Sequence, residues 1–333
     1  AAVVNMILKD TEITCTVAPA IICYSAYECG DDNPDMATKD VDTSGAGFNI
    51  TLADESVNII NGSHVAKIYN PGTEDKLHKY DGAFYSKMSI NINGGKNNTG
   101  ILNINAENEG LDSELHLTIN GGIINITSGN DGINTNEDNV SVTTVNGGTL
   151  NILCDGKTGE GDGIDSNGWL VINGGTVVAQ ACATSGDAGI DSDKGIYLNG
   201  GRVIASGNML DHIAGGEQTY AVFSFASHQV GDSTYALKNA DGKIIGEYAP
   251  RNDFTYLLVA GDELIAADYT FWQGDTQLSA SSMSGMPQGE RPQRPNGEQQ
   301  PEMPEDIERP EEPNGERPQR PESETPQKHE GME

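Results

Sequence analysis

Short stretches in which apolar and polar residues alternate recur along the chain, and each ends in Asn-Gly-Gly. The phrase reads NINGG at 91–95, TINGG at 118–122, TVNGG at 144–148, VINGG at 171–175 and YLNGG at 197–201. Its Asn residues are therefore 27, 26, 27 and 26 positions apart. A regular period of this length is typical of a solenoid, in which each repeat packs on its neighbours.

Each repeat contains two strand-like segments. The residues one and three positions before the Asn are apolar or Thr, which is the alternation of a strand with one buried face. A second segment follows the Gly pair, as in GIINITS at 122–128 and GTLNILC at 148–154. With β-branched residues throughout and no helical period, the pattern predicts an all-β protein, a parallel β-helix with about 26–27 residues per rung. A leucine-rich repeat has a similar period, but its fixed positions require Leu, whereas these hold Ile, Val and Thr.

The repeated Asn and Gly residues have an architectural explanation. Stacked side-chain amides hydrogen-bond along the axis of a solenoid whose rungs rise roughly 4.8 Å each. The Gly pair follows because the turn requires a positive φ. We therefore expect the column formed by Asn93, Asn120, Asn146, Asn173 and Asn199 to be architecture and not a ligand site.

The pattern divides the chain into three parts. Residues 1–210 are expected to form the β-helix, with less regular first rungs and a long acidic loop at 28–45. Residues 211–282 carry strand-like segments and a turn near Asp241, which predicts a small antiparallel β unit covering the open end of the helix. Residues 283–333 hold 10 of the 14 prolines and no aromatic residue, so this tail is expected to be disordered.

The chain is strongly acidic, with 50 Asp and Glu against 19 Lys and Arg and a net charge of -31. Such a polyanion repels nucleic-acid phosphates and anionic membrane surfaces, so neither is an expected partner. No apolar run approaches the ~18–20 residues that span a bilayer. The acidity of the folded part requires another explanation.

A second recurring phrase places acids on the turns. It reads ENEGLDS at 107–113, GNDGINT at 129–135, EGDGIDS at 160–166 and GDAGIDS at 186–192. Asp165 and Asp191 both stand eight residues before their Asn, so we expect them to stack on adjacent rungs. A second acidic column is expected on the other side of the glycine, formed by Glu109, Asp131 and Asp162, with Asp187 one position early.

Stacked carboxylates repel one another unless protons or a cation offset their charge. Turns rich in carboxylate, amide and backbone oxygens suit calcium, which takes roughly six to eight oxygen ligands. The alternative is an acidic edge whose charges point into solvent. The candidate metal ligands are Asp112, Asp131, Asn134, Glu160, Asp162, Asp165, Asp187, Asp191 and Asp193.

The phrases INGGT and DGIDS, with LADES at 52–56 and AFYSK at 83–87, resemble a bacterial family of secreted carbohydrate-binding domains. That family folds as right-handed parallel β-helices similar to calcium-dependent pectate lyases. The resemblance covers roughly residues 5–275 and implies the same hand, Ca2+ as cofactor, cellulose or acidic plant polysaccharide as partner, and an extracellular or cell-surface location. The sequence departs from the pattern at its first rungs and at Asn134 and Ala188, where an acid is expected. The implied calcium-bearing residues are Asp162, Asp165, Asp187 and Asp191.

Aromatic side chains facing outward would give sugar rings a surface to stack on. Trp169 stands four residues before its Asn and Tyr197 two before the next, so both are expected on the outer face. His116 lies two rungs from Trp169 on the same line. These three residues are the candidate carbohydrate contacts, although Trp169 could instead cover a loop.

Two other functions stay open. A calcium-dependent lyase needs a Lys or Arg base, for which Lys194 and Lys157 are the candidates, but a Lys in an acidic turn is more often an ion-pair partner. We therefore favour binding without catalysis. The third hypothesis is end-to-end association of the rungs into fibres, since open strand edges pair readily.

Overall fold

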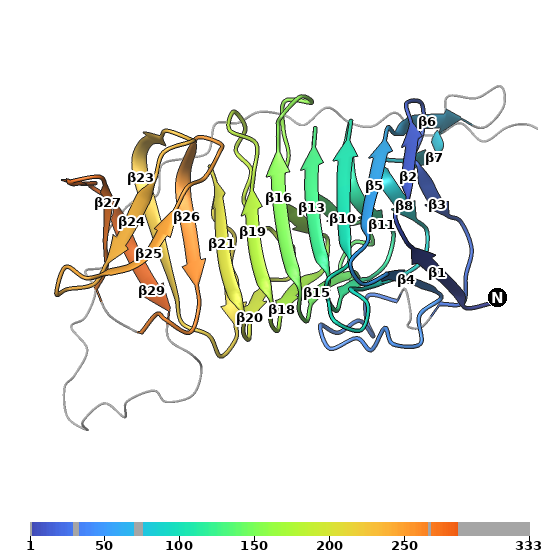
Figure 1. Cartoon of the computed structure of the whole chain (residues 1–333), viewed down its shortest axis with the longest axis horizontal. Helices are drawn as coiled ribbons and strands as arrows, with labels where there is room; N and C mark the ends of the chain where they lie inside the picture. The colour runs from blue at the N-terminus through green and yellow to red at the C-terminus, as the bar shows by residue number, and fades with distance from the viewer. Residues whose placement is uncertain (1, 29–32, 70–75, 266–267, 286–333) are drawn as a thin grey trace, which may run out of the picture. The chain divides into compact units, whose positions relative to one another are not determined.

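The computed structural model describes residues 2–28, 33–69, 76–265 and 268–285, which lie in one compact unit. These residues form strands and connecting loops and contain no helix (Figure 1). Accordingly, none of these ranges supplies a helix able to cross a membrane. Of the tail expected at 283–333, only residues 283–285 are described, and they belong to strand β29 (Ser281–Gly285).

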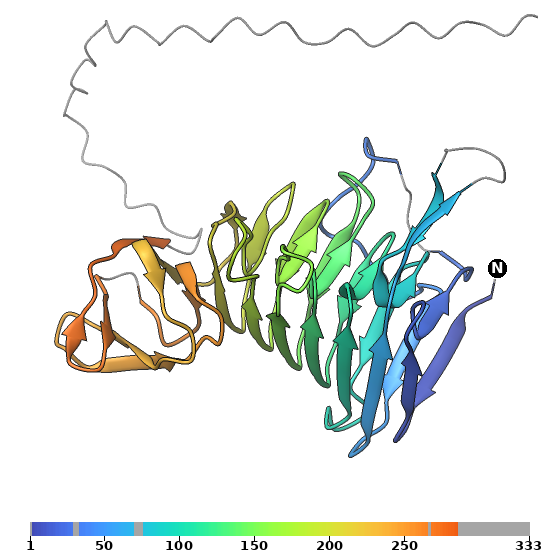
Figure 2. The ribbon, with the colours of Figure 1, turned by 90° about the horizontal axis from the view of Figure 1, so that it is seen from above.

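Three sheets of parallel strands make up the repeating part, and successive strands enter them in turn (Figures 1 and 2). In spatial order, the first sheet contains β1 (Val4–Leu8), β4 (Phe48–Leu52), β9 (Ile90–Asn93), β12 (Leu117–Ile119), β15 (Val142–Val145), β18 (Trp169–Ile172), β20 (Ile196–Leu198) and β22 (Ile213–Gly215). The second contains β2 (Glu12–Cys15), β5 (Val57–Gly62), β10 (Ile101–Ala106), β13 (Ile123–Ser128), β16 (Thr149–Cys154), β19 (Thr176–Gln180) and β21 (Arg202–Gly207). The third contains β3 (Ile21–Cys23), β8 (Gly82–Ser86), β11 (Glu109–Ser113), β14 (Ile133–Thr135) and β17 (Ile164–Ser166).

Apolar side chains at every second position form a continuous core, as the alternation predicts. In the first sheet, Ile92, Ile119, Val145, Ile172 and Leu198 are paired in register from one strand to the next, and all are buried. Burying each such side chain contributes roughly 1.5–3 kcal/mol. The repeat therefore stabilises each rung through its neighbours.

The Gly pairs turn the chain between the first and second sheets. Their second members Gly122, Gly148, Gly175 and Gly201 have φ values of +94°, +84°, +82° and +83°, which confirms the expected left-handed turn. A Cβ on Gly148 would lie 2.5 Å from the carbonyl oxygen of Gly122 on the preceding rung. These turns therefore require glycine for close stacking as well as for backbone conformation.

Antiparallel strands follow the last parallel rung. β26 (Phe254–Ala260) pairs with β21, which extends the second sheet through β23 (Tyr220–Gln229) to β29. A separate sheet has the order β25 (Ile244–Tyr248), β24 (Tyr235–Lys238), β27 (Thr270–Gln273) and β28 (Thr276–Gln277). Phe223, Tyr235, Phe254 and Phe271 form the centre of a second apolar core between these strands. A hairpin of β6 (Val65–Tyr69) and β7 (Lys76–Tyr80) precedes the regular rungs.

Candidate functional site

The acidic turns lie along the third sheet. Asp112, Asn134 and Asp165 are paired in register on β11, β14 and β17. A parallel bridge between Ile164 and Ile190 continues this first acidic column to Asp191. The predicted stacking of Asp165 and Asp191 is therefore confirmed, and the amide of Asn134 takes the place of one acid in the column.

The second acidic column bonds to the backbone of neighbouring rungs. Asp131 Oδ1 accepts a hydrogen bond from the N–H of Asp162 (2.7 Å), and Asp162 Oδ1 accepts one from the N–H of Ala188 (2.6 Å). Asp187 Oδ2 accepts from the N–H of Gly161 (2.5 Å). These bonds place each carboxylate between two rungs and satisfy one of its oxygens.

Most of these acids are not on a solvent-facing edge. Glu109 and Asp112 are only 3% and 1% exposed. Burial raises the pKa of Asp131 to about 7 and that of Asp165 to about 6, and neighbouring carboxylates add to both increases. Burial also raises the pKa of Asp162 to about 9, although its bond from Ala188 opposes the change. At neutral pH the two acidic columns, together called the acidic row below, therefore favour an added proton or cation.

Asp112 is held by donors from three residues. Its Oδ2 accepts hydrogen bonds from the backbone N–H groups of Asp81 (3.3 Å) and Gly82 (3.2 Å), and its Oδ1 accepts one from Asn136 Nδ2 (2.5 Å). Lys79 forms an ion pair with Asp81 beside it. Burial nevertheless raises the pKa of Asp112 well above its ordinary value, with Glu114 as the next cause.

Glu109 and Asn134 supply two oxygens that the protein leaves unbonded. Asn134 Nδ2 donates to Glu109 Oε1 (3.4 Å), but within the described ranges Glu109 Oε2 and Asn134 Oδ1 are buried without a hydrogen-bond partner. Such groups are costly unless a ligand or ion satisfies them. Their chemistry fits calcium, which binds carboxylate and amide oxygens.

A complete metal shell is not present in the side chains alone. Among the described residues, no three acidic, histidine or cysteine side chains are close enough together to hold a metal ion as placed. A cation beside Glu109 would therefore also need amide, backbone or ligand oxygens. The side chains of Glu160 and Asp193, at the margin of the row, are exposed.

Sequence reasoning missed two acids of the site. Asp81 precedes Gly82 in YDG, an acid–glycine pair like those of the later turns, and this signal could have identified it. Asp211 lies beyond the last recognised acidic turn. Burial first and then the Asp211 carboxylate raise the pKa of Asp191 to about 7, while the N–H of Ser192 donates to Asp211 Oδ2 (3.1 Å).

The two lysines considered as bases already have partners. Lys157 Nζ lies 2.5 Å from Asp155 Oδ2 in an ion pair. Lys194 Nζ lies over the ring of Trp169, 5.6 Å from its centroid. Both contacts are with neighbours on the protein surface.

The three candidate sugar contacts do not form one platform. Trp169 and Tyr197 are half-buried, and Tyr197 has Lys39 Nζ 5.1 Å from its ring centroid. The expectation that His116 faces outward was wrong, because its side chain is 3% exposed and Nδ1 accepts a hydrogen bond from the N–H of Val142 (3.1 Å). Burial lowers the pKa of His116, in keeping with a neutral ring that supports the next strand.

The larger part of the chain matches a known protein family. Residues 33–246 match the sequence model of a family described as carbohydrate-binding domain-containing protein. The matched range contains the regular rungs and both acidic columns. No curated protein and no solved structure gives a significant match.

Proposed function

The chain belongs to the family of carbohydrate-binding domain-containing proteins, and on that premise we propose that it binds plant-type polysaccharide through calcium without cleaving it. Of the two ligand types expected, cellulose and acidic pectin-like chains, a uronate chain is the one that calcium would bridge to an acidic protein. The net charge of -31 would otherwise repel it.

The observation that carries the proposal is the buried acidic row with unbonded oxygens at Glu109 and Asn134. These two residues would hold the ion together with Asp112 on β11 and Asp131 in the turn before β14. Bound calcium would neutralise the row and offer open coordination positions to a sugar carboxylate. The remaining candidate ligands, at 160–165 and 187–193, would extend the same row to later rungs.

We propose binding without cleavage because the lysines beside the acidic turns already have partners, including Lys79, which is near Asp112 and paired with Asp81. Proton removal next to a uronate carboxylate requires a free base positioned at the metal. Lys157 is paired with Asp155, and Lys194 lies against Trp169. We further propose that the three sheets wind as a right-handed parallel β-helix and that the protein acts outside the bacterial cell, both of which its resemblance to secreted domains supports.

Calorimetry of the full chain tests this proposal. Calcium is titrated first, then polygalacturonate with calcium or with a chelator, while absorbance of unsaturated product is recorded. We expect calcium to bind, sugar binding to require it, and absorbance to stay constant. Rising absorbance would make the protein a lyase, and sugar binding that is equal with chelator would refute the role of calcium.

A matched pair of variants locates the ion. Glu109→Gln keeps the shape of the buried side chain and removes its charge, so we expect calcium affinity to fall by roughly tenfold or more. Asp275→Asn changes an exposed acid in the turn between β27 and β28 and should leave affinity unchanged. Equal affinity in both variants would exclude Glu109 as a ligand.

A further inference from the structure

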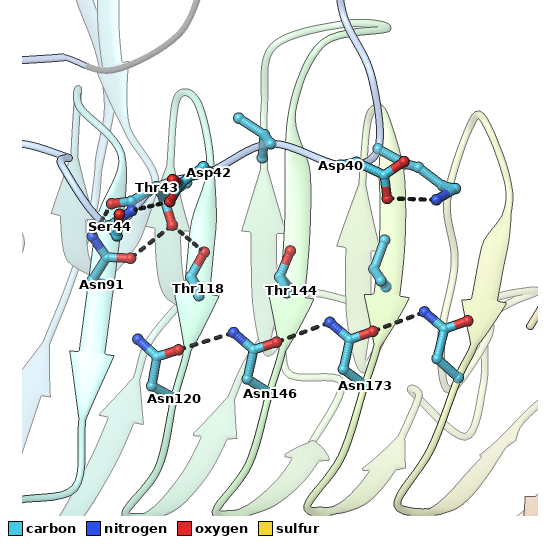
Figure 3. A pocket seen from close by; sticks show the side chains of 14 residues that line it. Asp40, Asp42, Thr43, Ser44, Asn91, Thr118, Asn120, Thr144, Asn146 and Asn173 are labelled. Atoms are coloured by element: carbon cyan, nitrogen blue, oxygen red, sulfur yellow. Dashed lines mark hydrogen bonds and ion pairs between the residues drawn. The ribbon is translucent and has the colours of Figure 1, made fainter.

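A separate cavity lies on the outer face of the first sheet. Residues 39–44, called the strap below, pass over this face beside the Asn column, and a space of about 230 Å³ lies between them (Figure 3). We call this space the groove. It belongs to a different sheet from the acidic row, so it can bind a ligand independently.

The strap is fixed to the sheet at both ends. Thr43 Oγ1 donates to Asn91 Oδ1 (2.8 Å) and shares a hydrogen bond with Thr118 Oγ1 (2.6 Å), while Asn91 Nδ2 donates to the Thr43 carbonyl oxygen (2.6 Å). At the other end, Lys39 Nζ lies over the ring of Tyr197. These contacts hold the wall of the groove in place without filling the groove between them.

The opposite wall is the Asn column itself. Asn120, Asn146, Asn173 and Asn199 are exposed, and each donates Nδ2 to the oxygen of the preceding Asn at 2.8–3.2 Å. A side-chain amide has two N–H donors and two acceptor lone pairs, so every inner amide keeps one of each for a ligand. The column is thus a row of paired donors and acceptors repeated at the strand spacing of roughly 4.8 Å.

The floor of the groove adds a hydroxyl and a small apolar surface. Thr118, Thr144 and Val171 are paired in register on β12, β15 and β18 and face outward beneath the strap. Among the described residues, the Thr144 hydroxyl has no hydrogen-bond partner. A sugar ring offers the matching surfaces, with hydroxyls at its rim and C–H groups on its faces.

The charges of the groove select against an acidic chain. Lys39 is the cation of the lining, and its Nζ lies 2.5 Å from Asp40 Oδ1, which neutralises it. Asp42 adds a negative charge, and hydrogen bonds from Ser44 lower its pKa. A uronate would meet this negative charge, and the one lysine of the described lining is already paired with Asp40, whereas an uncharged glycan has no charge for Asp42 to repel.

From these features we propose that the groove binds an uncharged, hydroxyl-rich glycan chain lying along the Asn column. The inference rests on the proposed carbohydrate-binding function and adds to it a second site with its own ligand class. The Asn column was expected to be architecture alone. Its hydrogen bonds confirm that role, and its exposed amides beside a roofed cavity add the binding role.

The test uses calorimetry of the full chain with cellohexaose as an uncharged probe and a chelator present. Thr144→Arg places a long side chain in the groove, and we expect cellohexaose affinity to fall by roughly tenfold or more. Thr149→Arg changes an equally half-buried Thr at the start of β16 on the same rung, outside the groove, and should have no effect. Equal affinities in the two variants would overturn the proposal.

A second pair separates binding from stacking. Asn146→Ala and Asn125→Ala each remove two inter-rung amide bonds, those of Asn146 with Asn120 and Asn173 (both 2.9 Å) and those of Asn125 with Asn103 and Asn151 (both 2.8 Å), but only Asn146 lines the groove. We expect Asn146→Ala alone to weaken cellohexaose binding. Equal effects of both variants would mean that the column matters only for stability.

The two proposals fail separately. A wild-type chain that binds polygalacturonate with calcium but does not bind cellohexaose would refute the groove proposal and leave the calcium-dependent function intact. Binding of cellohexaose alone, reduced by Thr144→Arg, would support the groove and refute calcium bridging. A chain that binds neither probe refutes both.

Discussion

At the residue scale, the half-buried Asp162 is the clearest case of a side chain that destabilises the protein unless its charge is offset. Its pKa is raised to about 9, so at pH 8 without calcium the folded state must take up a proton or bear a buried charge. We expect Asp162→Asn to raise the Tm by a few degrees under these conditions, since about 1 kcal/mol moves the Tm of a domain of this size by roughly 2–4 °C. The amide oxygen can still accept the bond from Ala188.

The same substitution should have the opposite effect when calcium is present. Calcium bound by the row stabilises the folded state, and loss of a carboxylate reduces that gain. Thermal unfolding at pH 8 with calcium and with chelator measures both effects, and Asp275→Asn serves as the exposed control. A variant that is less stable than the wild type in chelator would show that the charged form of Asp162 is favoured in the fold.

Individual residues also show how far sequence could predict the site. The stacking of Asp165 on Asp191 followed from their equal distance to the Asn column, because a strict period fixes the register. His116 was misplaced because it precedes β12, where the turn and not the strand sets the direction of the side chain. Asp81 was missed because it lies before the regular period begins, although β8 pairs with β11.

At the element scale, the Gly turns combine two requirements that substitution can separate. Gly148 and Gly242 have similar φ values, +84° and +77°, but a Cβ on Gly242 would meet no atom within 4 Å, whereas one on Gly148 would clash with the preceding rung. We expect Gly242→Ala to cost roughly 1–2 kcal/mol through its backbone alone. Gly148→Ala should cost roughly 1–3 kcal/mol more because it also forces the rungs apart.

Urea unfolding of both variants measures the difference. It requires the transition of the parallel rungs to be followed separately from that of the C-terminal strands, for example by hydrogen exchange. If both variants lost the same free energy of unfolding, the stacked turns would have adjusted to the added methyl group without strain.

One end of the strap is held to the first sheet through Thr43. Thr43 is 4% exposed, and its hydroxyl joins Asn91 to Thr118. Thr43→Val keeps the volume but leaves these partners unsatisfied, so we expect a loss of roughly 1–3 kcal/mol in the free energy of unfolding. Cellohexaose affinity should fall with it, because the groove loses a fixed wall.

Thr149→Val is the control for this prediction, since Thr149 lies half-buried on the second sheet and does not line the groove. Chemical denaturation and calorimetry of both variants provide the two measurements. Unchanged stability of Thr43→Val would mean that the strap is not held through this hydroxyl.

The strands that recur at a regular interval along the chain were predicted from the sequence, whereas the path of the strap, which has no repeating pattern, was not. Alternation and Asn spacing gave the strands of successive rungs and their parallel pairing, since each position repeats the same environment. The strap was recognised only as an acidic loop at 28–45. Its path depends on contacts with Asn91 and Tyr197, which are distant in sequence and have no repeating signature.

At the scale of the whole molecule, acidity links stability to pH and calcium. Asp131, Asp162 and Asp165, which are buried or half-buried, have raised pKa values, so between pH 4 and about 9 these groups bind more protons in the folded state than in the unfolded state. Stability must then fall as pH rises through that window. Calcium should offset the loss, because a cation replaces the protons that leave the row.

We therefore expect the Tm of the full chain in chelator to be higher at pH 5 than at pH 8, and calcium to raise it much more at pH 8. A monovalent salt at equal ionic strength is the control, since it screens the surface charges but reaches buried carboxylates poorly. If salt restored the Tm as well as calcium did, general repulsion within a chain of net charge -31 would explain the pH dependence. If only calcium raised the Tm, and this rise disappeared at pH 5, the pH dependence would instead come from the acidic row, where protons and calcium compete for the same oxygens.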